Sequence, residues 1–246
     1  MRKYLTVLSV EGRVSLRTPE GLMFGIGMPM AVLLLISMLA GNQVVKTGDY
    51  TFLQSSYPAL VTVGICATAF MGLPLTIADY RDKKILKHFF TTPTSPLFLM
   101  SIQVVLCILL ALASALGVTG VAVLVLGYRM PGSWLGFVSV YFLVMFSMYS
   151  MGMMLASLCR TMKQANLICN LVYFTMLFLS GSVIPFEIFP ERMQKIANML
   201  PLTQGVRLLK IVSLEGLRSL PLLPLLYLLL FGIIGIIVSV KTFRWE

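Results

Sequence analysis

The sequence predicts an all-α membrane protein with six transmembrane helices, and its composition gives the first reason. Of 246 residues, 58% are hydrophobic and 11% are charged, and the mean hydropathy is +0.93. A soluble domain typically carries about 25% charged residues, so lipid must cover much of this surface. We therefore expect residues 1–246 to form a single domain embedded in a lipid bilayer.

Six tracts of the sequence are long and apolar enough to cross roughly 30 Å of hydrocarbon as a helix, which takes about 20 residues. No tract contains a charged residue, so nearly all the charge lies between them. The predicted crossings are residues 22–41, 57–78, 99–127, 134–158, 165–184 and 220–240. The third is long enough to tilt, or to break near Gly117 and Gly120. The first follows a mixed segment and should remain as a membrane anchor rather than a cleaved signal.

The basic residues predict the orientation, because loops that face the cytoplasm are enriched in Lys and Arg. With both termini cytoplasmic, the two short outer loops contain only Lys46 and Arg129. The inner segments then contain Arg2, Lys3, Arg13, Arg17, Arg81, Lys83, Lys84, Lys87, Arg160, Lys163, Lys241 and Arg244. Five more lie in a long outer segment, where the bias is weaker. We expect a multi-pass protein of the inner (plasma) membrane.

The first twenty residues mix apolar and basic side chains, which indicates an amphipathic helix on the inner membrane surface. Tyr4, Leu5 and Leu8 alternate with Arg2 and Lys3 in this segment. The apolar face is not continuous, so a poorly ordered basic tail is the alternative. Residues 1–20 are accordingly expected to form a cytoplasmic interface helix.

The inner loop after the second crossing contains a second amphipathic pattern. Apolar residues recur there at helical spacing, namely Ile85, Leu86, Phe89 and Phe90. The basic residues beside them are Lys83, Lys84, Lys87 and His88, and the segment is bounded by Pro93 and Pro96. A short helix projecting into the cytoplasm would give this pattern. Such a helix could rest on anionic lipid or insert into a partner subunit.

The segment after the fifth crossing is too charged to cross a membrane and too apolar for a free loop. Met193, Ile196, Ala197 and Leu200 form one helical face after Pro190, and a second short helix is expected after Gly205. Interrupted helices at membrane depth are tolerated only against protein or a water-filled cavity. We expect short outer re-entrant helices punctuated by Pro185, Glu187, Pro190, Pro201 and Arg207.

Several kinds of chemistry are missing from the sequence. The segment Gly41 to Gly48 lacks the glycine that precedes the lysine of a P-loop. No metal-ligand pair is evident, the only histidine is His88, and the four cysteines read as small apolar residues. The net charge is +10, and the basic residues lie in clusters beside apolar runs. This position indicates that they set the membrane topology rather than bind nucleic acid. We expect neither an enzyme nor a cofactor on this chain.

The fifth crossing has a polar face. Asn166, Asn170, Tyr173 and Ser180 fall on one side of a helix. Such a stripe avoids lipid, and it could line a transport pathway or simply hydrogen-bond helices together. Both interpretations stay open from the sequence.

Three stretches of the sequence resemble the ABC-2 permease family, and within it the branch of drug and antibiotic exporters. RTPEGLMFGIGMPM is similar to the family's entry into the first crossing. YRDKKILKHFFTTPTSP is similar to its cytoplasmic stretch that ends in Thr-Pro, although Lys84 stands where glycine is common. SGSVIPFEIFPERMQKIANMLPLTQGVRLLK is similar to its outer segment of short helices.

The resemblance implies a permease that pairs with a second copy, or a close relative, and binds two separate ATP-hydrolysing subunits that hold ATP and Mg. We expect the ATPase contacts at Asp82, Lys83, Lys84, Leu86, Lys87, Phe89, Phe90, Arg160 and Lys163. The complex would export a drug, antibiotic, peptide or other amphipathic molecule. A membrane sensor or assembly factor coupled to an ATPase, without transport, is the alternative.

Overall fold

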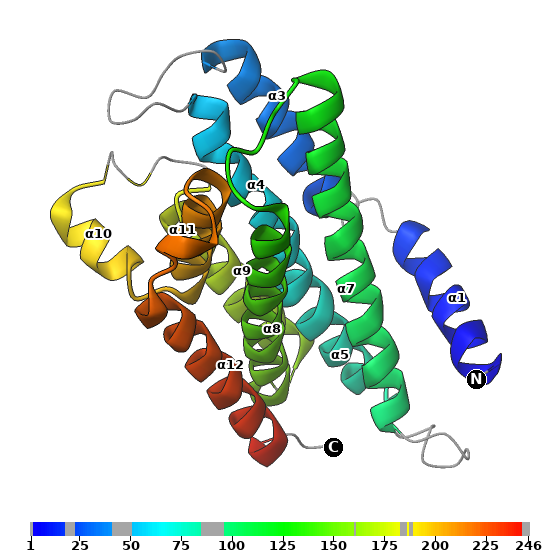
Figure 1. Cartoon of the computed structure of the whole chain (residues 1–246). Helices are drawn as coiled ribbons and strands as arrows, with labels where there is room; N and C mark the ends of the chain where they lie inside the picture. The colour runs from blue at the N-terminus through cyan, green and yellow to red at the C-terminus, as the bar shows by residue number, and fades with distance from the viewer. Residues whose placement is uncertain are drawn as a thin grey trace.

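The computed structural model describes residues 2–17, 23–40, 51–84, 96–159, 161–182, 186 and 189–242. Helices account for all the regular structure in these ranges, and no strand is present there, which confirms the all-α prediction for them. The helices run largely antiparallel to one another in a bundle (Figure 1). The elements are α1 (Arg2–Arg17), η1 (Met23–Gly27), α3 (Met28–Ala40), α4 (Phe52–Ala67), η2 (Thr68–Gly72), α5 (Leu73–Asp82), α7 (Pro96–Gly120), η3 (Val121–Val125), α8 (Trp134–Leu158), α9 (Met162–Leu179), α10 (Glu191–Ala197), α11 (Pro201–Leu214), η5 (Leu217–Ser219) and α12 (Leu222–Thr242).

Four helices in the described ranges are long and apolar enough to cross a membrane. They are Phe52–Asp82, Phe98–Val125, Trp134–Leu158 and Leu222–Thr242. The helix Trp134–Leu158 has the bounds of the fourth predicted crossing, and Phe52–Asp82 extends beyond the second predicted crossing at both ends. The first predicted crossing contains a shorter apolar helix, Gly25–Met38, and the fifth overlaps the 18-residue α9. Four of the six predicted crossings therefore correspond to helices long and apolar enough to span a membrane, and the count of six stays a prediction.

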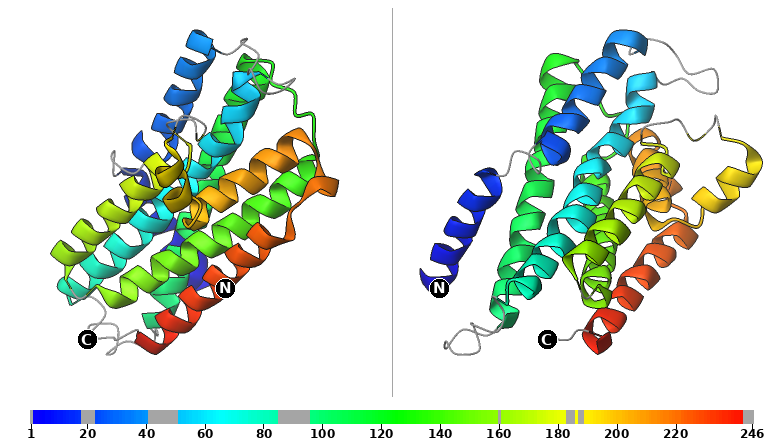
Figure 2. Two further views of the ribbon diagram at one scale, coloured as in Figure 1. Left: turned by 90° about the vertical axis from the view of Figure 1, so that its left-hand side faces the viewer. Right: turned by 180° about the vertical axis from the view of Figure 1, so that it is seen from behind.

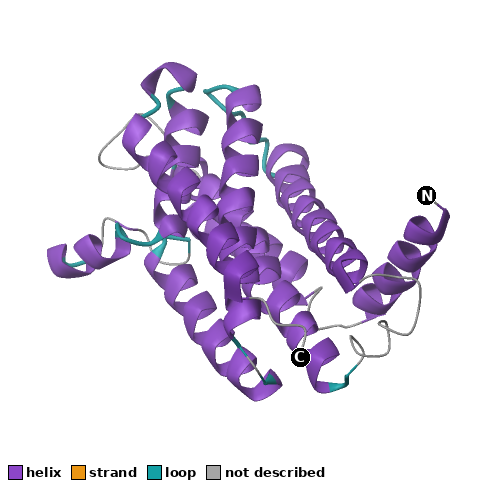
Figure 3. Ribbon diagram, turned by 90° about the horizontal axis from the view of Figure 1, so that it is seen from below, coloured by secondary structure: helices purple, strands orange, loops and turns teal. Residues whose placement is uncertain are grey.

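The connections between helices sort to two ends of the bundle. One end of the bundle contains the starts of α1 and α7 and the last turns of α5 and α12 (Figures 1 and 2). We call it the termini end. The turn between α8 and α9 lies at the same end, whereas the turn between α7 and α8 lies at the opposite end. Viewed from below, α1 stands at the periphery of the bundle (Figure 3). Both ends of the described chain therefore lie on the same side of the bundle.

The continuous helix formed by α4, η2 and α5 is the centre of the bundle. In its most apolar window 78% of the residues are buried, compared with 28% for Phe98–Val125 and 22% for Leu222–Thr242. It packs against α3, α7, α8, α9 and α11. The outer helices are correspondingly rich in exposed large apolar side chains, as expected where lipid or another subunit covers them.

A π-helical turn interrupts the central helix. A π turn inserts an extra residue into the α-helical ladder and commonly marks a functional position. In η2 the Thr68 hydroxyl lies 2.8 Å from the Gly64 carbonyl and 2.6 Å from the Tyr149 hydroxyl of α8. A similar turn, η3, begins directly after Gly120, so the third crossing changes pitch where a break was predicted but does not end there.

The segment between α9 and α12 contains two short α-helices, as predicted, and the 3-10 turn η5. α10 begins directly after Pro190, whereas α11 begins at Pro201 and not after Gly205. Proline suits the first helical turn because its backbone has no N–H to satisfy and its φ is already helical. α11 packs between α4, α8 and α12, and a Cβ added at Gly205 would lie 2.7 Å from Val144. α11 is therefore part of the core rather than a helix at the rim.

Candidate functional site

The last turn of α5 meets the turn between α8 and α9 at the termini end. Nη1 of Arg81 donates hydrogen bonds to the carbonyl oxygens of Cys159, at 2.6 Å, and Ala156, at 3.4 Å. These carbonyls belong to the last turn of α8, where unpaired backbone C=O groups create partial negative charge. The guanidinium of Arg81 therefore stabilises the carboxyl end of α8.

The next residue, Asp82, contacts the amino end of α9. Its Oδ2 accepts a hydrogen bond of 2.9 Å from the backbone N–H of Met162, the first residue of α9. The hydroxyl of Thr161 accepts a second one, of 3.3 Å, from the N–H of Gln164. Two of the backbone donors left unpaired at this helix start are thus satisfied, and the carboxylate also matches the positive end of the helix dipole.

Two consecutive residues of opposite charge thus hold two helix ends of opposite polarity. We call this arrangement the α5 clamp: Arg81 and Asp82 with Ala156, Cys159 and Met162. Beneath it, Ala78, Cys159 and Ala165 form a small apolar cluster against which Leu75 and Met162 pack. The clamp makes the end of α5 and the α8–α9 turn one connected unit.

The two lysines after the clamp end the helix in different ways. Lys83 pairs with Asp79 at 2.7 Å across one exposed helical turn, a contact worth only a few tenths of a kcal/mol. Lys84 has a φ of +55°, and its N–H donates to the Arg81 carbonyl at 3.0 Å. This left-handed conformation after the last helical residue is the one that glycine adopts most readily.

The remaining predicted ATPase contacts divide into two groups. Lys163 is exposed on the first turn of α9 and directly follows Met162, whose N–H bonds Asp82. Leu86, Lys87, Phe89, Phe90 and Arg160 lie outside the described residues. The structure therefore places the start of the predicted contact surface and not the predicted coupling helix itself.

The amino-terminal segment is a helix, α1, and it docks on α7. The rings of Tyr4 and Phe98 are 5.4 Å apart and perpendicular, and a Cβ added at Gly12 would lie 3.4 Å from Leu106. Glu11 lies near the Tyr80 hydroxyl at the end of α5. A helix is thus present over Arg2–Arg17, and its contacts link it to the same helix end as the clamp. Its placement on the inner membrane surface stays a prediction.

The predicted polar face of α9 changes character along the helix. Asn166 is exposed, and the side chain of the half-buried Asn170 donates to its backbone carbonyl at 2.7 Å. Tyr173 and Ser180 are buried, and Ser180 bonds Ser182, whose hydroxyl donates to Ala59 of α4 at 3.3 Å. The half of the face near the termini end is therefore accessible, whereas the other half holds α9 against the central helix.

Three of the five predicted residues of the outer segment lie within the described ranges. Pro190 precedes α10, Pro201 begins α11, and Arg207 is exposed on α11. Pro185 and Glu187 lie outside the described residues. The exposed fractions of Met193 and Ile196 are 40% and 59%, so of the predicted apolar face of α10 only Ala197 is fully buried.

Arg81 is the functional residue of this region that sequence reasoning missed. The sequence pattern marks Arg81 only as one more inner positive charge, although adjacent basic and acidic residues at a helix end can indicate contacts to two helix termini. Three of the four free cysteines, Cys66, Cys107 and Cys169, are buried among apolar groups, as expected, whereas Cys159 also offers its carbonyl to the clamp.

Comparisons with known proteins agree with this architecture. The model of a family described as ABC-2 type transporter matches residues 2–214. The chain belongs to this family. Two curated relatives of this ABC-2 chain are the inner membrane transport permease YhhJ of Escherichia coli (strain K12) and that of Shigella flexneri. Each is 28% identical over 141 residues, which cover 55% of this chain and 37% of the relative. Family and relatives identify a transmembrane transporter subunit.

Proposed function

We propose that this ABC-2 chain is the permease subunit of an exporter driven by separate ATPase subunits, with six crossings and both termini in the cytoplasm. Two ATPase subunits bind at the termini end, where they hold ATP and Mg. The cargo is a drug, antibiotic, peptide or other amphipathic molecule. Family membership, the permease relatives and the basic surface at the termini end support this proposal.

The α5 clamp is the observation that carries the proposed coupling. An ATPase changes the membrane path only through contacts that differ between two states. The expected contact segment, Asp82 to Phe90, begins directly at Arg81 and Asp82, which hold α8 and α9. A force on this segment therefore reaches three membrane helices at once, and the π turn η2 lies above it in the same helix.

A second copy of the chain would cover the exposed side of α9. Leu167, Leu171, Phe174 and Phe178 recur three to four residues apart, and their exposed fractions lie between 45% and 72%. The rings of Phe174 and Phe178 are stacked, with their centroids 6.3 Å apart, so this surface is apolar and aromatic. Pairing along α9 would bring the accessible Asn166 and Asn170 of two copies to a shared path between the subunits.

Replacement of Lys163 by Glu tests the ATPase contact. The variant reverses a charge on an exposed residue, so the membrane fold should persist while the attached ATPase and its hydrolysis are lost. Lys195→Glu, exposed on α10, is the matched control. Leu86→Asp and Phe89→Asp should also detach the ATPase. Recovery of ATPase with Lys163→Glu equal to that with Lys195→Glu, in a pull-down from detergent-solubilised membranes, would contradict the proposed surface.

A further inference from the structure

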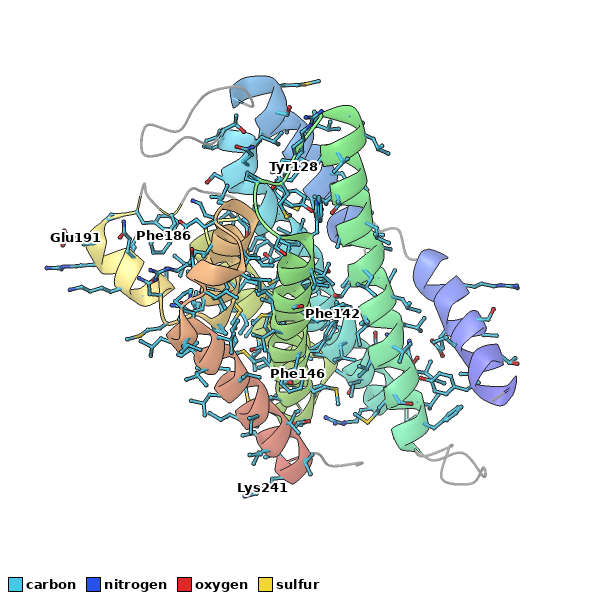
Figure 4. The ribbon with its side chains drawn as sticks, viewed as in Figure 1. Tyr128, Phe142, Phe146, Phe186, Glu191 and Lys241 are labelled. Carbon is cyan, nitrogen blue, oxygen red and sulfur yellow. The ribbon has the colours of Figure 1, made fainter. Side chains whose placement is uncertain are left out.

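A groove of about 430 Å³ lies between α7, α8 and α12 on the outside of the bundle. Ile108 of α7, Phe142 and Phe146 of α8, and Ile236 and Val240 of α12 line it. Figure 4 shows Phe142 and Phe146 on α8 in the space between α7 and α12. Phe142, Phe146, Ile236 and Val240 are 40% to 75% exposed, so the groove is open along its side.

The groove arises from the way α12 packs. A Cβ added at Gly232 would lie 2.5 Å from the Phe146 ring, and one at Gly235 would lie 2.8 Å from the Ser150 backbone. These glycines bring α12 against α8, so the larger Ile236 and Val240 next to them flank the contact instead of filling it. A continuous apolar trough therefore runs beside the α8–α12 contact.

The polar side chains in the lining are already hydrogen-bonded within the protein. The Tyr149 hydroxyl bonds Thr68 at 2.6 Å, and Ser150 and Ser239 donate to the carbonyls of Phe146 and Met153. The groove thus offers hydrocarbon contacts and few free donors or acceptors. Because α7, α8 and α12 are helices fit to span a membrane, the surrounding medium at this depth is acyl chains.

Lys241 supplies a charge at one end of the groove. It follows Val240, is exposed, and lies at the end of α12 in Figure 4. Among the described residues it has no carboxylate partner. A lysine at the end of a membrane helix extends its ammonium group to the headgroup region. We propose that this groove binds one acyl chain of an anionic phospholipid whose headgroup contacts Lys241.

This lipid site depends on the transmembrane placement of three helices and not on transport, so it can fail while the proposed function holds. The test reconstitutes the full chain in vesicles of equal phosphatidylglycerol and phosphatidylcholine, extracts it in mild detergent, and counts retained lipid by native mass spectrometry. The wild type should retain one phospholipid per chain, with phosphatidylglycerol favoured about fivefold, as one lysine near an anionic headgroup provides.

Two neighbouring isoleucines provide a matched pair of variants. Ile236 lines the groove and is 43% exposed, whereas Ile237 is 47% exposed and does not line it. Ile236→Trp should fill the groove and abolish retention, and Ile237→Trp should leave retention unchanged. Lys241→Gln, on the exposed end of the helix, should keep one lipid but lose the preference for phosphatidylglycerol.

Three results would overturn the lipid site. One is equal retention by the two tryptophan variants, both eluting as folded protein on size exclusion. Another is an unchanged phosphatidylglycerol preference in Lys241→Gln. The third is a disulfide-linked dimer formed by Ile236→Cys in vesicles, which would show that a second copy of the chain occupies the groove.

Discussion

Gly152 of α8 lies directly against the backbone carbonyl oxygen of Ala69 in the π turn η2. A Cβ added at Gly152 would collide with this oxygen and lie 3.1 Å from its carbonyl carbon. The obstacle is backbone, which cannot rotate away as a side chain can. The absence of a side chain at Gly152 therefore sets the distance between α8 and the central helix.

Substitution of Gly152 by Val should lower the free energy of unfolding by about 1–3 kcal/mol, the usual cost of overpacking. Thermal melting in detergent, followed by circular dichroism, measures the effect. Gly120→Ala is the control, because nothing lies within 4 Å of a Cβ added there. Alanine in that helix should be neutral or stabilise by about 0.5–1 kcal/mol. Equal melting temperatures for the two variants would contradict the close approach.

Replacement of Arg81 by Gln should destabilise the protein by about 1–2 kcal/mol. Hydrogen bonds to charged groups contribute about 1.5–3 kcal/mol, and the half-buried position of Arg81 reduces this value. Hydrogen exchange should increase in the last turn of α8. Arg192→Gln, on an exposed position of α10, removes the same charge without such contacts. An unchanged exchange rate near Ala156 and Cys159 would argue against the clamp.

Lys84 and Lys83 should respond to glycine in opposite directions. A left-handed backbone costs a non-glycine residue about 1–2 kcal/mol, so Lys84→Gly should stabilise the protein by about 0.5 kcal/mol after the entropy loss of glycine. Lys83 has a φ of −77°, so Lys83→Gly should destabilise it. Chemical denaturation of the two variants compares them, and the same sign of change in both would be the contrary result.

Ser114 holds three helices close together, so its loss should be costly. Its hydroxyl donates to the Gly25 carbonyl of η1 at 2.6 Å, and it fills the space beside Gly64 of α4. Ser114→Ala leaves a buried carbonyl unpaired, which should cost about 1–3 kcal/mol. In Ser139→Ala the lost bond is exposed and local, so its melting temperature should stay within about a degree of the wild type. A Ser114→Ala variant as stable as Ser139→Ala would refute this role.

Cysteine labelling in the native background can test the orientation. Cys66, Cys107, Cys159 and Cys169 are all buried. Burial raises the pKa of the Cys159 thiol, and the nearby Arg81 offsets part of this increase. Only a small fraction of the Cys159 side chains is therefore in the reactive thiolate form at neutral pH. The wild type should therefore react slowly with maleimide.

An added cysteine should then be labelled from one side of the membrane only. Lys195→Cys on α10 should react with an impermeant maleimide added outside intact cells, and Lys163→Cys should react only after the membrane is opened. Both residues are exposed. The reverse pattern would invert the proposed topology, and labelling of both from outside would mean that the α9 start and α10 share one side.

The helices that the sequence predicted well are those limited by strong local signals. α8 has the predicted bounds because it lies between the turn at Ser133 and the end at Cys159, with no charged residue between them. The central helix begins five residues earlier than predicted, at Phe52. Thr51 and Gln54 form a capping box there, and this T-x-x-Q pattern was visible in the sequence.

Other features could not be predicted because they result from packing between distant segments. α9 begins at Met162, three residues before the predicted start, where Asp82 of the distant α5 accepts a hydrogen bond from the Met162 N–H. α11 is buried through contacts with α4, α8 and α12 that no local pattern records. The partners of Arg81 and Asp82 lie 75 to 80 residues away in the chain.

The order of Arg81 and Asp82 in the chain has a mechanical consequence. Neighbouring residues on a helix are rotated about 100° apart around its axis, so one side chain faces the end of α8 while the next faces the start of α9. A twist of α5 about its own axis therefore displaces both side chains together. The tip of α5 thus transmits a rotation of α5 to both helices of the α8–α9 hairpin.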